Sequence, residues 1–464
     1  MNVPKSIFRQ YDVRGLVGRE LTPDFARALG RAFGSVAFDR LGRAPVIAVG
    51  RDNRPSGPGL ADGVRRGIAE TGGTAIDVGT LPTPALYFGV SALRTDGGLQ
   101  VTGSHNPPEF NGFKMVLAGE AFHGEEILEL WDIIMAERWR SGKGKETSDS
   151  SVLQRYREGI ISRNKLERPV RVVVDCGNGA GSLIAVSTLQ GLGADVTPLF
   201  CESDGTFPNH HPDPTVPENL RDLQMEVRRS GAELGIAFDG DADRIGAVDE
   251  TGEIIYGDQL LVIFGRDAVR RFGPGTPVIF DVKCSEVLPS ALSSAGAKPV
   301  MWKTGHSLIK AKMKELKAPL AGEMSGHMFF GGDYLGFDDA LFAAARLLEI
   351  LSRQPFGLAA LLADLPRTFA TPEIRVETAE EEKFDLVERA ALHFATLYPV
   401  NTIDGVRITF PHGWGLLRAS NTQPVLVMRF EATDPALRDE YRAEVEGWLE
   451  GQKKAVAAAS ARKA

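Results

Sequence analysis

Three aspartates alternate with small residues in the motif DGDADR, residues 239–244. Carboxylates this close together raise one another's pKa unless a cation neutralises them. A hard divalent cation is the natural partner, and three carboxylates leave coordination positions for phosphate oxygens, as Mg²⁺ requires. We therefore expect a Mg²⁺ site beside a phosphate group, with the ligands Asp239, Asp241 and Asp243.

The same segment also matches part of a calcium-binding loop. Positions 1, 3, 5 and 12 of that pattern are occupied by Asp239, Asp241, Asp243 and Glu250. Position 6 is Arg244, where the calcium loop needs glycine for its turn, and the preceding residues are typical of a strand. An acidic surface loop without a metal is a second alternative. The context favours a catalytic metal site over both.

A candidate nucleophile, Ser104, follows a glycine in VTGSHNPPEFNGFK, residues 101–114. Such a serine is usually structural, because a nucleophilic hydroxyl needs a base, a lowered pKa or a metal. A metal held by the aspartates would meet that need, and a phosphoserine, with a charge of about −2, would supply a further metal ligand. Lys114 can offset the charge that develops on a moving phosphoryl group.

Two further motifs carry groups that suit a phosphorylated sugar. GEMSGH offers a carboxylate, a hydroxyl and an imidazole, which match the donors and acceptors of sugar hydroxyls, from Glu323, Ser325 and His327. RASNTQP offers a candidate phosphate clamp made of Arg418, Ser420, Asn421 and Thr422. Helix capping is the alternative for the serines and the asparagine. Other candidate binding residues, outside these two motifs, are Tyr11, Arg14, Lys283 and His306.

The elements that must position these groups recur three times. Each unit has a short β-branched strand, a helix-length segment, a second strand, and a third strand that ends in a polar loop. The first strands are expected at residues 45–50, 170–175 and 277–282, and the second strands at 72–79, 193–200 and 296–302. Open α/β sheets place ligand groups at the carboxyl ends of their strands. Three units that face one another would therefore bring the polar loops together.

Length and pattern predict four domains. A chain of 464 residues is too long for one core, and beyond Pro366 the pattern changes to that of a smaller α+β domain. We expect an α/β domain I with the serine loop, an α/β domain II with the metal loop, an α/β domain III with the sugar loop and an α+β domain IV with the phosphate clamp. Their expected bounds are 1–148, 149–252, 253–366 and 367–464.

Composition narrows the class of protein. Apolar residues make up 43% and charged residues 25%, as in ordinary globular proteins. The net charge of −8 offers no field for nucleic acid. No segment suits a signal peptide or a membrane span, so we expect a cytoplasmic protein without membrane partners, as a monomer or weak homo-oligomer. The three cysteines, too widely spaced for a zinc site, are expected to be plain thiols: Cys176, Cys201 and Cys284.

A metal-linked serine and a separate phosphate clamp together predict that a phosphoryl group moves between the two ends of one sugar. The serine phosphate would pass to the free end and give a bisphosphate. After the sugar turns round, the other phosphate would return to Ser104. Catalysis would rest on positioning, charge stabilisation and the exclusion of water.

Five motifs resemble those of the α-D-phosphohexomutase superfamily in order and spacing over residues 8–430: YDVRG, TGSHNPPEFNGFK, DGDADR, GEMSGH and RASNT. Within it, the chain is similar to the bacterial phosphomannomutase/phosphoglucomutase group. The resemblance implies four domains around a central cleft, with a last domain similar to the TATA-binding-protein fold. It also implies Mg²⁺ and a hexose 1,6-bisphosphate activator or intermediate.

The resemblance assigns roles to single residues. Ser104 matches the phosphoserine and a metal ligand, the three aspartates match the Mg²⁺ ligands, and Glu323 and Ser325 match residues that hold the sugar hydroxyls. The clamp of residues 418–422 matches the distal phosphate loop. Further cleft residues, with His306 and Lys114 as candidates for proton transfer, are Arg14, Lys114, Arg244, Lys283, His306 and His327.

The resemblance also bears on the substrate. Phosphoglucosamine mutases typically carry Gln where this chain has Met324, which favours the glucose or mannose type. The alternatives are a phosphoglucosamine mutase, a catalytically silent sugar-phosphate-binding relative and a metal-dependent phosphomonoesterase, since a small change in a sugar site redirects specificity.

Overall fold

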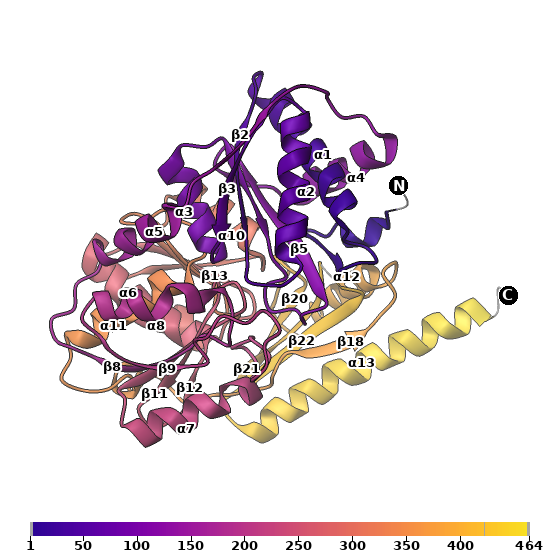
Figure 1. The fold of residues 1–464 in the computed structure, drawn as a ribbon. Helices are drawn as coiled ribbons and strands as arrows, with labels where there is room; N and C mark the ends of the chain where they lie inside the picture. Colours follow the sequence, from indigo (N-terminus) through magenta and orange to yellow (C-terminus); the bar gives the residue numbers. More distant parts are fainter. Residues whose placement is uncertain (1–2, 422, 462–464) are drawn as a thin grey trace.

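The computed structural model describes residues 3–421 and 423–461, with side chains to residue 454. Within these ranges the chain forms four β-sheets, one after another along the sequence. Figure 1 shows the first sheet and its helices at the top, the second sheet at the lower left, β13 (Pro277–Asp281) of the third sheet near the middle and the fourth sheet at the lower right.

The first sheet has the strand order β1-β5-β4-β2-β3-β7, and β6 pairs with β5. Its strands are β1 (Val13–Leu16), β2 (Val46–Arg51), β3 (Thr74–Thr80), β4 (Gly97–Val101), β5 (Phe110–Leu117), β6 (Glu120–Ala121) and β7 (Lys145–Ser148). Its helices are α1 (Pro23–Leu41), α2 (Gly57–Glu70), α3 (Thr83–Leu93) and α4 (Glu125–Ala136). The local sequence sets the ends of α1, because Thr22 accepts a hydrogen bond from the N–H of Phe25 and Gly42 ends the helix in a left-handed conformation.

The second and third sheets follow in the orders β12-β11-β10-β8-β9 and β14-β13-β15-β16. The second contains β8 (Arg171–Asp175), β9 (Asp195–Leu199), β10 (Leu234–Phe238), β11 (Ile245–Asp249) and β12 (Ile254–Ile255), and the third β13 (Pro277–Asp281), β14 (Lys298–Trp302), β15 (Leu320–Gly322) and β16 (Met328–Phe330). The helices of this region are α5 (Val152–Ile161), α6 (Ala185–Gly191), α7 (Arg221–Ser230), α8 (Gly257–Phe272), α9 (Val287–Ser294), α10 (His306–Leu316) and α11 (Ala340–Ser352).

The three sheets share one arrangement, as the sequence repeats predict. In each, the first strand of the unit lies in the middle, parallel to the second strand on one side and to the third on the other, in the orders β3-β2-β4, β9-β8-β10 and β14-β13-β15. An antiparallel strand then pairs with the third: β5, β11 or β16. The carboxyl ends of β4, β10 and β15 therefore carry the serine, aspartate and GEMSGH motifs.

The fourth sheet is antiparallel, in the order β17-β22-β21-β20-β19 with β18 beside β22. Its strands are β17 (Phe369–Ala370), β18 (Ile374–Glu377), β19 (Val400–Asn401), β20 (Val406–Phe410), β21 (Gly413–Ala419) and β22 (Val425–Ala432). The helices α12 (Lys383–Phe394) and α13 (Pro435–Ala461) share an apolar core with these strands, and α13 is the long yellow helix in Figure 1. This is the α+β domain expected from the sequence.

One hydrophobic core joins the second and third units. It contains residues of β8, β10, β13 and α8, and it surrounds α11, whose thirteen residues are all buried. Its two charged side chains, Arg346 and Glu349, lie 3.5 Å apart as an ion pair, which allows the helix to be buried along its whole length. Because this core is continuous, the metal loop and the GEMSGH loop stand on a single rigid base. Among the described residues, we find no helix that combines the length and apolarity needed to cross a membrane.

Candidate active site

Ser104 contacts the loop of residues 239–244, called the metal loop below, through its side chain. Its hydroxyl donates a hydrogen bond to Oδ2 of Asp239, 135 positions away, at 2.9 Å, and it is 3.2 Å from Nδ1 of His105. The side chain is buried, and the backbone has a φ of 50°, in the left-handed region that a residue with a Cβ rarely adopts. The surrounding structure must therefore hold this conformation in place.

Arg54 provides that support. Its buried guanidinium donates to the backbone carbonyls of Ser104 at 2.7 Å and Asn106 at 2.6 Å, and further to those of Pro107 and Phe110. It also pairs with Asp52, whose Oδ2 accepts from the hydroxyl of Thr102 at 2.8 Å. A guanidinium has five N–H donors in a fixed plane, so one side chain can fix several carbonyls of a loop.

The metal loop packs against the serine without spare room. A Cβ at Gly240 would lie 2.3 Å from the carbonyl oxygen of Ser104, so only glycine permits this approach. The carboxylates of Asp239, Asp241 and Asp243 are all buried. Strand β10 and the antiparallel β11 enclose the loop and fix its direction.

Lys114, on β5 of the first sheet, lies among these carboxylates. Its ammonium donates to Asp241 at 2.8 Å and also to Asp243. Although burial opposes its charge, the two aspartates raise the pKa of Lys114 well above its usual value. Burial and the neighbouring aspartates raise the pKa of Asp239 well above the ordinary range, whereas Lys114, against the effect of burial, lowers that of Asp241.

The aspartate cluster fits a divalent cation. Ligand atoms of Asp239, Asp241 and Asp243 lie within 4.8 Å of one another. Among the described residues, Oδ1 of Asp241 and Oδ1 of Asp243 have no hydrogen-bond partner although both are buried. Unpaired buried carboxylate oxygens are costly, and a cation would satisfy them.

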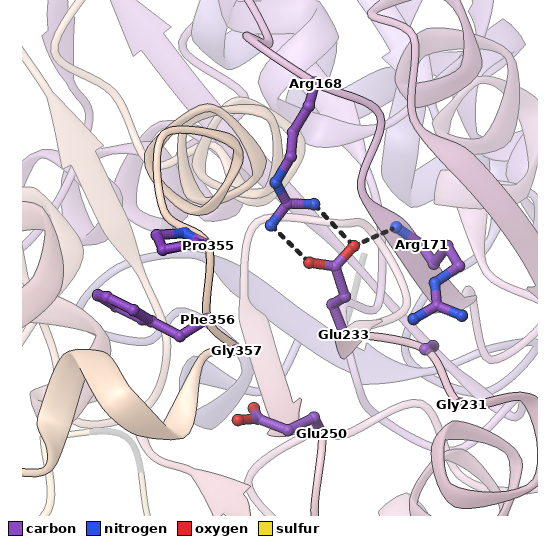
Figure 2. A pocket seen from close by; sticks show the side chains of 9 residues that line it. Arg168, Arg171, Gly231, Glu233, Glu250, Pro355, Phe356 and Gly357 are labelled. Atoms are coloured by element: carbon purple, nitrogen blue, oxygen red, sulfur yellow. Dashed lines mark hydrogen bonds and ion pairs between the residues drawn. The ribbon is translucent and has the colours of Figure 1, made fainter.

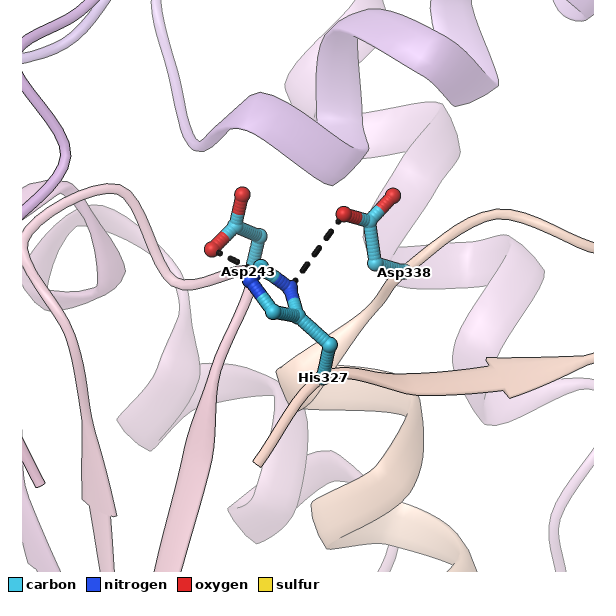
Figure 3. Close-up of side chains that lie close together, drawn as sticks. All are labelled: Asp243, His327 and Asp338. Carbon is cyan, nitrogen blue, oxygen red and sulfur yellow. Dashed lines mark ion pairs between the residues drawn. The ribbon is translucent and has the colours of Figure 1, made fainter. Parts of the chain in front are cut away.

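His327 connects the metal loop to the third unit. Its Nδ1 lies 3.6 Å from Asp243 and 3.3 Å from Asp338, and Figure 3 shows the ring between the two carboxylates. Its Nε2 accepts a hydrogen bond from Nε of Arg244 at 3.0 Å, so the ring proton is on Nδ1 in this arrangement. The side chains of Asp243, His327 and Asp338 are a second group whose geometry could hold a metal.

His306 stacks on His327 with the ring centroids 5.9 Å apart. Burial and the charge of Lys310 lower the pKa of His306 well below its usual value, which keeps the imidazole neutral. Its Nδ1 has no hydrogen-bond partner among the described residues and lies 3.8 Å from Asp338. The two stacked rings thus place imidazole nitrogens beside the metal loop.

The GEMSGH loop contacts its neighbours through Glu323. This carboxylate accepts from the N–H of Gly305 at 2.6 Å and from the hydroxyl of Ser325 at 3.3 Å. Tyr11 donates to the carbonyl of Thr304 at 3.0 Å and accepts from Asn421 at 3.1 Å, so it joins the first, third and fourth units. Burial raises the pKa of Tyr11 to about 12.

The candidate phosphate clamp lies at the end of β21. Arg418 pairs with Asp404 at 3.0 Å, and the hydroxyl of Ser420 accepts from the N–H of Gln423 at 3.2 Å. Asn421 contacts Tyr11, as described above, whereas Thr422 lies outside the described residues.

Two other predicted cationic residues are held beside these loops. Lys283 faces Glu373 at 3.5 Å and Asp281 at 3.9 Å. Arg14 donates to Asn106 of the serine loop at 2.9 Å and pairs with Asp12 at 2.5 Å.

A continuous series of contacts joins the four units. It runs from Ser104 of the first to Asp239 and Asp243 of the second, then through the imidazoles of the third, and through Tyr11 to Asn421 of the fourth. The residues in this series, far apart in sequence, therefore lie in one region of the molecule.

A cavity of about 400 Å³ lies elsewhere. Figure 2 shows its lining, in which Glu233 binds the guanidinium of Arg168 and the N–H of Arg171. Arg171 begins β8 and Glu233 precedes β10, so this cavity is at the opposite edge of the second sheet from the metal loop. Of the residues that the motifs singled out, it contains Glu250 of the calcium-loop pattern but no predicted catalytic, metal-binding or substrate-binding residue.

Sequence reasoning missed several residues that shape the site. Besides Asp52, Arg54 and Asp338, Thr83 donates to Oδ2 of Asp241 at 2.5 Å, and its N–H donates to the carbonyl of the same residue. Asp52 and Arg54 follow β2, and Thr83 follows β3. Position at the carboxyl end of a strand was the signal that could have found them.

A serine bound to a carboxylate cluster that could hold a cation, beside a fixed ammonium and a separate arginine-containing loop, is an arrangement suited to phosphoryl transfer. Four family models match the chain in order: phosphoglucomutase/phosphomannomutase alpha/beta/alpha domains I, II and III, and the C-terminal domain. The matched residues are 5–141, 154–252, 256–369 and 373–447. The chain belongs to the phosphoglucomutase/phosphomannomutase family, and it is an enzyme, a phosphotransferase mutase.

Close relatives cover nearly the whole chain. A phosphomannomutase/phosphoglucomutase of Pseudomonas aeruginosa is 49% identical over 93% of this chain and 92% of its own length. A phosphoglucomutase of Neisseria gonorrhoeae is 44% identical over 96% and 98%. A crystal structure of a family protein from Burkholderia thailandensis superposes with a TM-score of 0.90 at 42% identity, covering 97% of this chain and 98% of that one. The predicted superfamily and fold class are confirmed.

Proposed function

We propose that this enzyme interconverts hexose 1-phosphate and hexose 6-phosphate, with glucose and/or mannose as the sugar, through a phosphoserine at Ser104 and a hexose 1,6-bisphosphate. The observation that carries the proposal is the 2.9 Å hydrogen bond between the Ser104 hydroxyl and the metal-loop carboxylate of Asp239. Because the two residues come from different sheets, only the docking of the first unit on the second creates this contact.

The cofactor proposed for the site is Mg²⁺, held by Asp239, Asp241, Asp243 and an oxygen on Ser104. When bound, Mg²⁺ neutralises phosphoryl oxygens and orients them for in-line transfer. The unpaired Oδ1 atoms of Asp241 and Asp243 support this ligand set. Hard oxygen ligands and phosphate together favour Mg²⁺ over softer metals.

In the first half-reaction, the free hydroxyl of the sugar attacks the phosphorus of phosphorylated Ser104. A bond forms between the sugar oxygen and phosphorus, and the bond between phosphorus and the serine oxygen breaks. Lys114, kept cationic by two carboxylates, offsets the charge on the transferred group. It is therefore better suited to charge stabilisation than to taking a proton.

We assign the proton transfer to the stacked imidazoles of His306 and His327. His306 is neutral and its Nδ1 is unpartnered among the described residues, so it can accept the proton of the attacking hydroxyl. Arg244 orients the His327 ring through Nε2. Arg14, which is bound to the serine loop, adds a second fixed cation near the transferred group.

The remaining residues hold the sugar and its second phosphate. We place the sugar hydroxyls against Glu323 and Ser325, with Tyr11, Lys283 and His327 beside them. The non-reacting phosphate binds the loop of Arg418, Ser420, Asn421 and Thr422, which has a guanidinium and hydroxyls that suit an oxyanion. After the bisphosphate turns round, the second half-reaction returns the other phosphate to Ser104 and regenerates the phosphoenzyme.

An assay with glucose 1-phosphate and mannose 1-phosphate tests this function. With Mg²⁺ and a trace of the corresponding 1,6-bisphosphate, we expect the 6-phosphates to form without steady release of inorganic phosphate, and activity to cease when a chelator removes the metal. Steady phosphate release would identify a phosphomonoesterase instead. Binding of the sugar phosphates without turnover would identify a silent relative, and faster turnover of glucosamine 1-phosphate a phosphoglucosamine mutase.

A further inference from the structure

Two free cysteines lie side by side at the carboxyl edge of the second sheet. Cys176 directly follows β8, and Cys201 follows its parallel neighbour β9 after one residue. The two thiols share a hydrogen bond, with the sulfur atoms 3.0 Å apart. They therefore lie at the same edge of the same sheet as the metal loop, which follows β10.

The backbone fixes this pairing of thiols. Asp175 and Leu199 are register partners in the parallel pair, and the N–H of Cys176 donates to the carbonyl of Leu199 at 3.2 Å. Phe200, with a φ of 48°, turns the chain between β9 and Cys201. A disulfide needs sulfur atoms about 2.05 Å apart, so closure requires an approach of only about 1 Å.

We propose that Cys176 and Cys201 form a reversible disulfide when a peroxide oxidises them, and that this bond lowers the mutase activity. The activity half of the proposal rests on the function proposed above, whereas formation of the bond does not. Neither sulfur belongs to the proposed catalytic or binding groups. The sequence spacing alone gave no sign of the pair, because the two cysteines are 25 positions apart.

The accessibility of the two thiols determines which of them reacts with the peroxide first. Cys201 is partly exposed, whereas Cys176 is fully buried. The contact between the two sulfur atoms lowers the pKa of Cys201, and the same contact together with burial raises the pKa of Cys176 well above its usual value. Because it is the more accessible of the two, Cys201 is the thiol that meets the oxidant first, and it reacts as its thiolate.

The disulfide forms in two steps. The Cys201 thiolate attacks one oxygen of hydrogen peroxide, the O–O bond breaks, and the products are a sulfenic acid and hydroxide, which takes up a proton as water. The Cys176 sulfur then attacks the Cys201 sulfur, the S–O bond breaks, and a second water leaves with the thiol proton. Overall, two thiols lose two electrons and two protons to one peroxide. A dithiol reductant reverses the reaction by thiol exchange.

Short contacts connect the cysteine pair to the active site. The carbonyl of Cys176 accepts from the N–H of Gly179 at 2.8 Å, and the next residue, Ala180, donates to the carbonyl of Gly240 at 2.8 Å. Gly240 in turn packs against the carbonyl of Ser104 with no room for a Cβ. A shift of Cys176 toward Cys201 therefore acts on a loop that supports the metal-binding carboxylates.

Peptide mass analysis tests the proposal. The phosphorylated full-length enzyme is treated with hydrogen peroxide, blocked with N-ethylmaleimide and digested without reduction. We expect a cross-linked pair of peptides containing Cys176 and Cys201, a loss of activity of at least about fivefold, and recovery of both with dithiothreitol. Sulfinic or sulfonic acid at Cys201 without the cross-link would overturn the proposal, and so would a cross-linked enzyme of unchanged activity.

Two variants serve as controls. Cys201→Ala retains the basal activity, gives no cross-link and resists peroxide, because the exposed thiol is gone. Cys284→Ala still gives the cross-link, since Cys284 is buried on the third unit and donates to Asp281 instead of to another thiol. Equal peroxide sensitivity of Cys201→Ala and the unmodified enzyme would contradict the inhibitory role of the pair. If the untreated enzyme had no mutase activity, the proposed function would fail while the cross-link would still report on the thiols.

Discussion

The hydroxyl of Ser104 donates a hydrogen bond to the carboxylate of Asp239, at 2.9 Å, although the two residues stand on different sheets. This contact places the candidate phosphorylation site on the candidate metal site. Arg54 fixes the serine loop from one side and Gly240 permits the close approach from the other. The proposed phosphoryl transfer requires this junction, because the serine oxygen and the carboxylates must lie beside the same phosphoryl group.

Replacement of Ser104 by alanine tests the nucleophile. We expect Ser104→Ala to lose interconversion by a factor of roughly 10⁴ or more, because no other group can carry the phosphoryl between the half-reactions. The thermal unfolding midpoint should stay close to that of the unmodified enzyme, since only one hydroxyl is removed. Ser325→Ala is the matched control: it should raise the KM for the sugar phosphate and leave a readily measured kcat. Undiminished activity of Ser104→Ala would remove the assignment.

Asp241→Asn tests the metal ligands. The change removes one anionic ligand and one of the two carboxylates that hold Lys114, so we expect activity to fall by roughly 10²-fold and the Mg²⁺ concentration for half-maximal activity to rise. The measurement is a Mg²⁺ titration of the initial rate. Asp249→Asn is the matched control at the far end of β11, where the carboxylate only accepts turn hydrogen bonds that an amide can also accept. An unchanged Mg²⁺ dependence of Asp241→Asn would count against the ligand role.

Arg54→Lys tests whether the serine loop needs its support. Lysine keeps the charge but cannot reach four carbonyls in one plane, so we expect kcat to fall by roughly 10- to 100-fold with little change in KM. Steady-state kinetics separate the two parameters. Arg51→Lys, a half-buried neighbour that pairs with Asp77, should change neither by more than about twofold. A rise in KM alone would show that Arg54 does not position the nucleophile.

Asp339 gives a prediction about pH and stability. This buried carboxyl caps α11 at the N–H of Phe342 and accepts from two tyrosines, and burial raises its pKa from 3.8 to about 6. The folded state therefore binds the proton more tightly than the unfolded state, so stability is lost as the pH rises from about 4 to 6. Asp339→Asn has no proton to lose.

Thermal unfolding of both proteins across this pH range checks the prediction. Relative to the unmodified enzyme, Asp339→Asn should gain stability as the pH rises from about 4 to 7, by an amount on the order of 3 kcal/mol. A constant difference between the two midpoints at all pH values would show that Asp339 titrates normally in the folded state.

The sequence predicted the recurring sheets because strand position and loop polarity are local properties. The polar loops after β4, β10 and β15 carried the serine, the aspartates and the carboxylate of GEMSGH, and the comparisons confirm the family that those motifs indicated. The domain bounds near 148, 252 and 366, the role of each site residue, the cytoplasmic location and the oligomeric state stay predictions.

Contacts that arise from docking between units could not be predicted from the sequence. Lys114 lies on β5, and nothing in its own segment shows that it will pair with Asp241 and Asp243. The same holds for the thiols of Cys176 and Cys201, whose proximity follows from the register of β8 and β9. Arg54 and Thr83 each follow a strand of the first unit, so their place at the carboxyl edge of the sheet was predictable from the sequence, whereas their contacts with Ser104 and Asp241 were not.

The most direct test of the account is to locate the phosphoryl group. Purified enzyme is incubated with glucose 1,6-bisphosphate and Mg²⁺. Its intact mass is measured by mass spectrometry, and it is then digested for peptide mapping. We expect one phosphoryl group, on Ser104, that disappears when excess glucose 1-phosphate or glucose 6-phosphate is added and that is absent from Ser104→Ala. An active enzyme that carries no phosphoryl group, or carries it on a residue other than Ser104, would contradict the central claim.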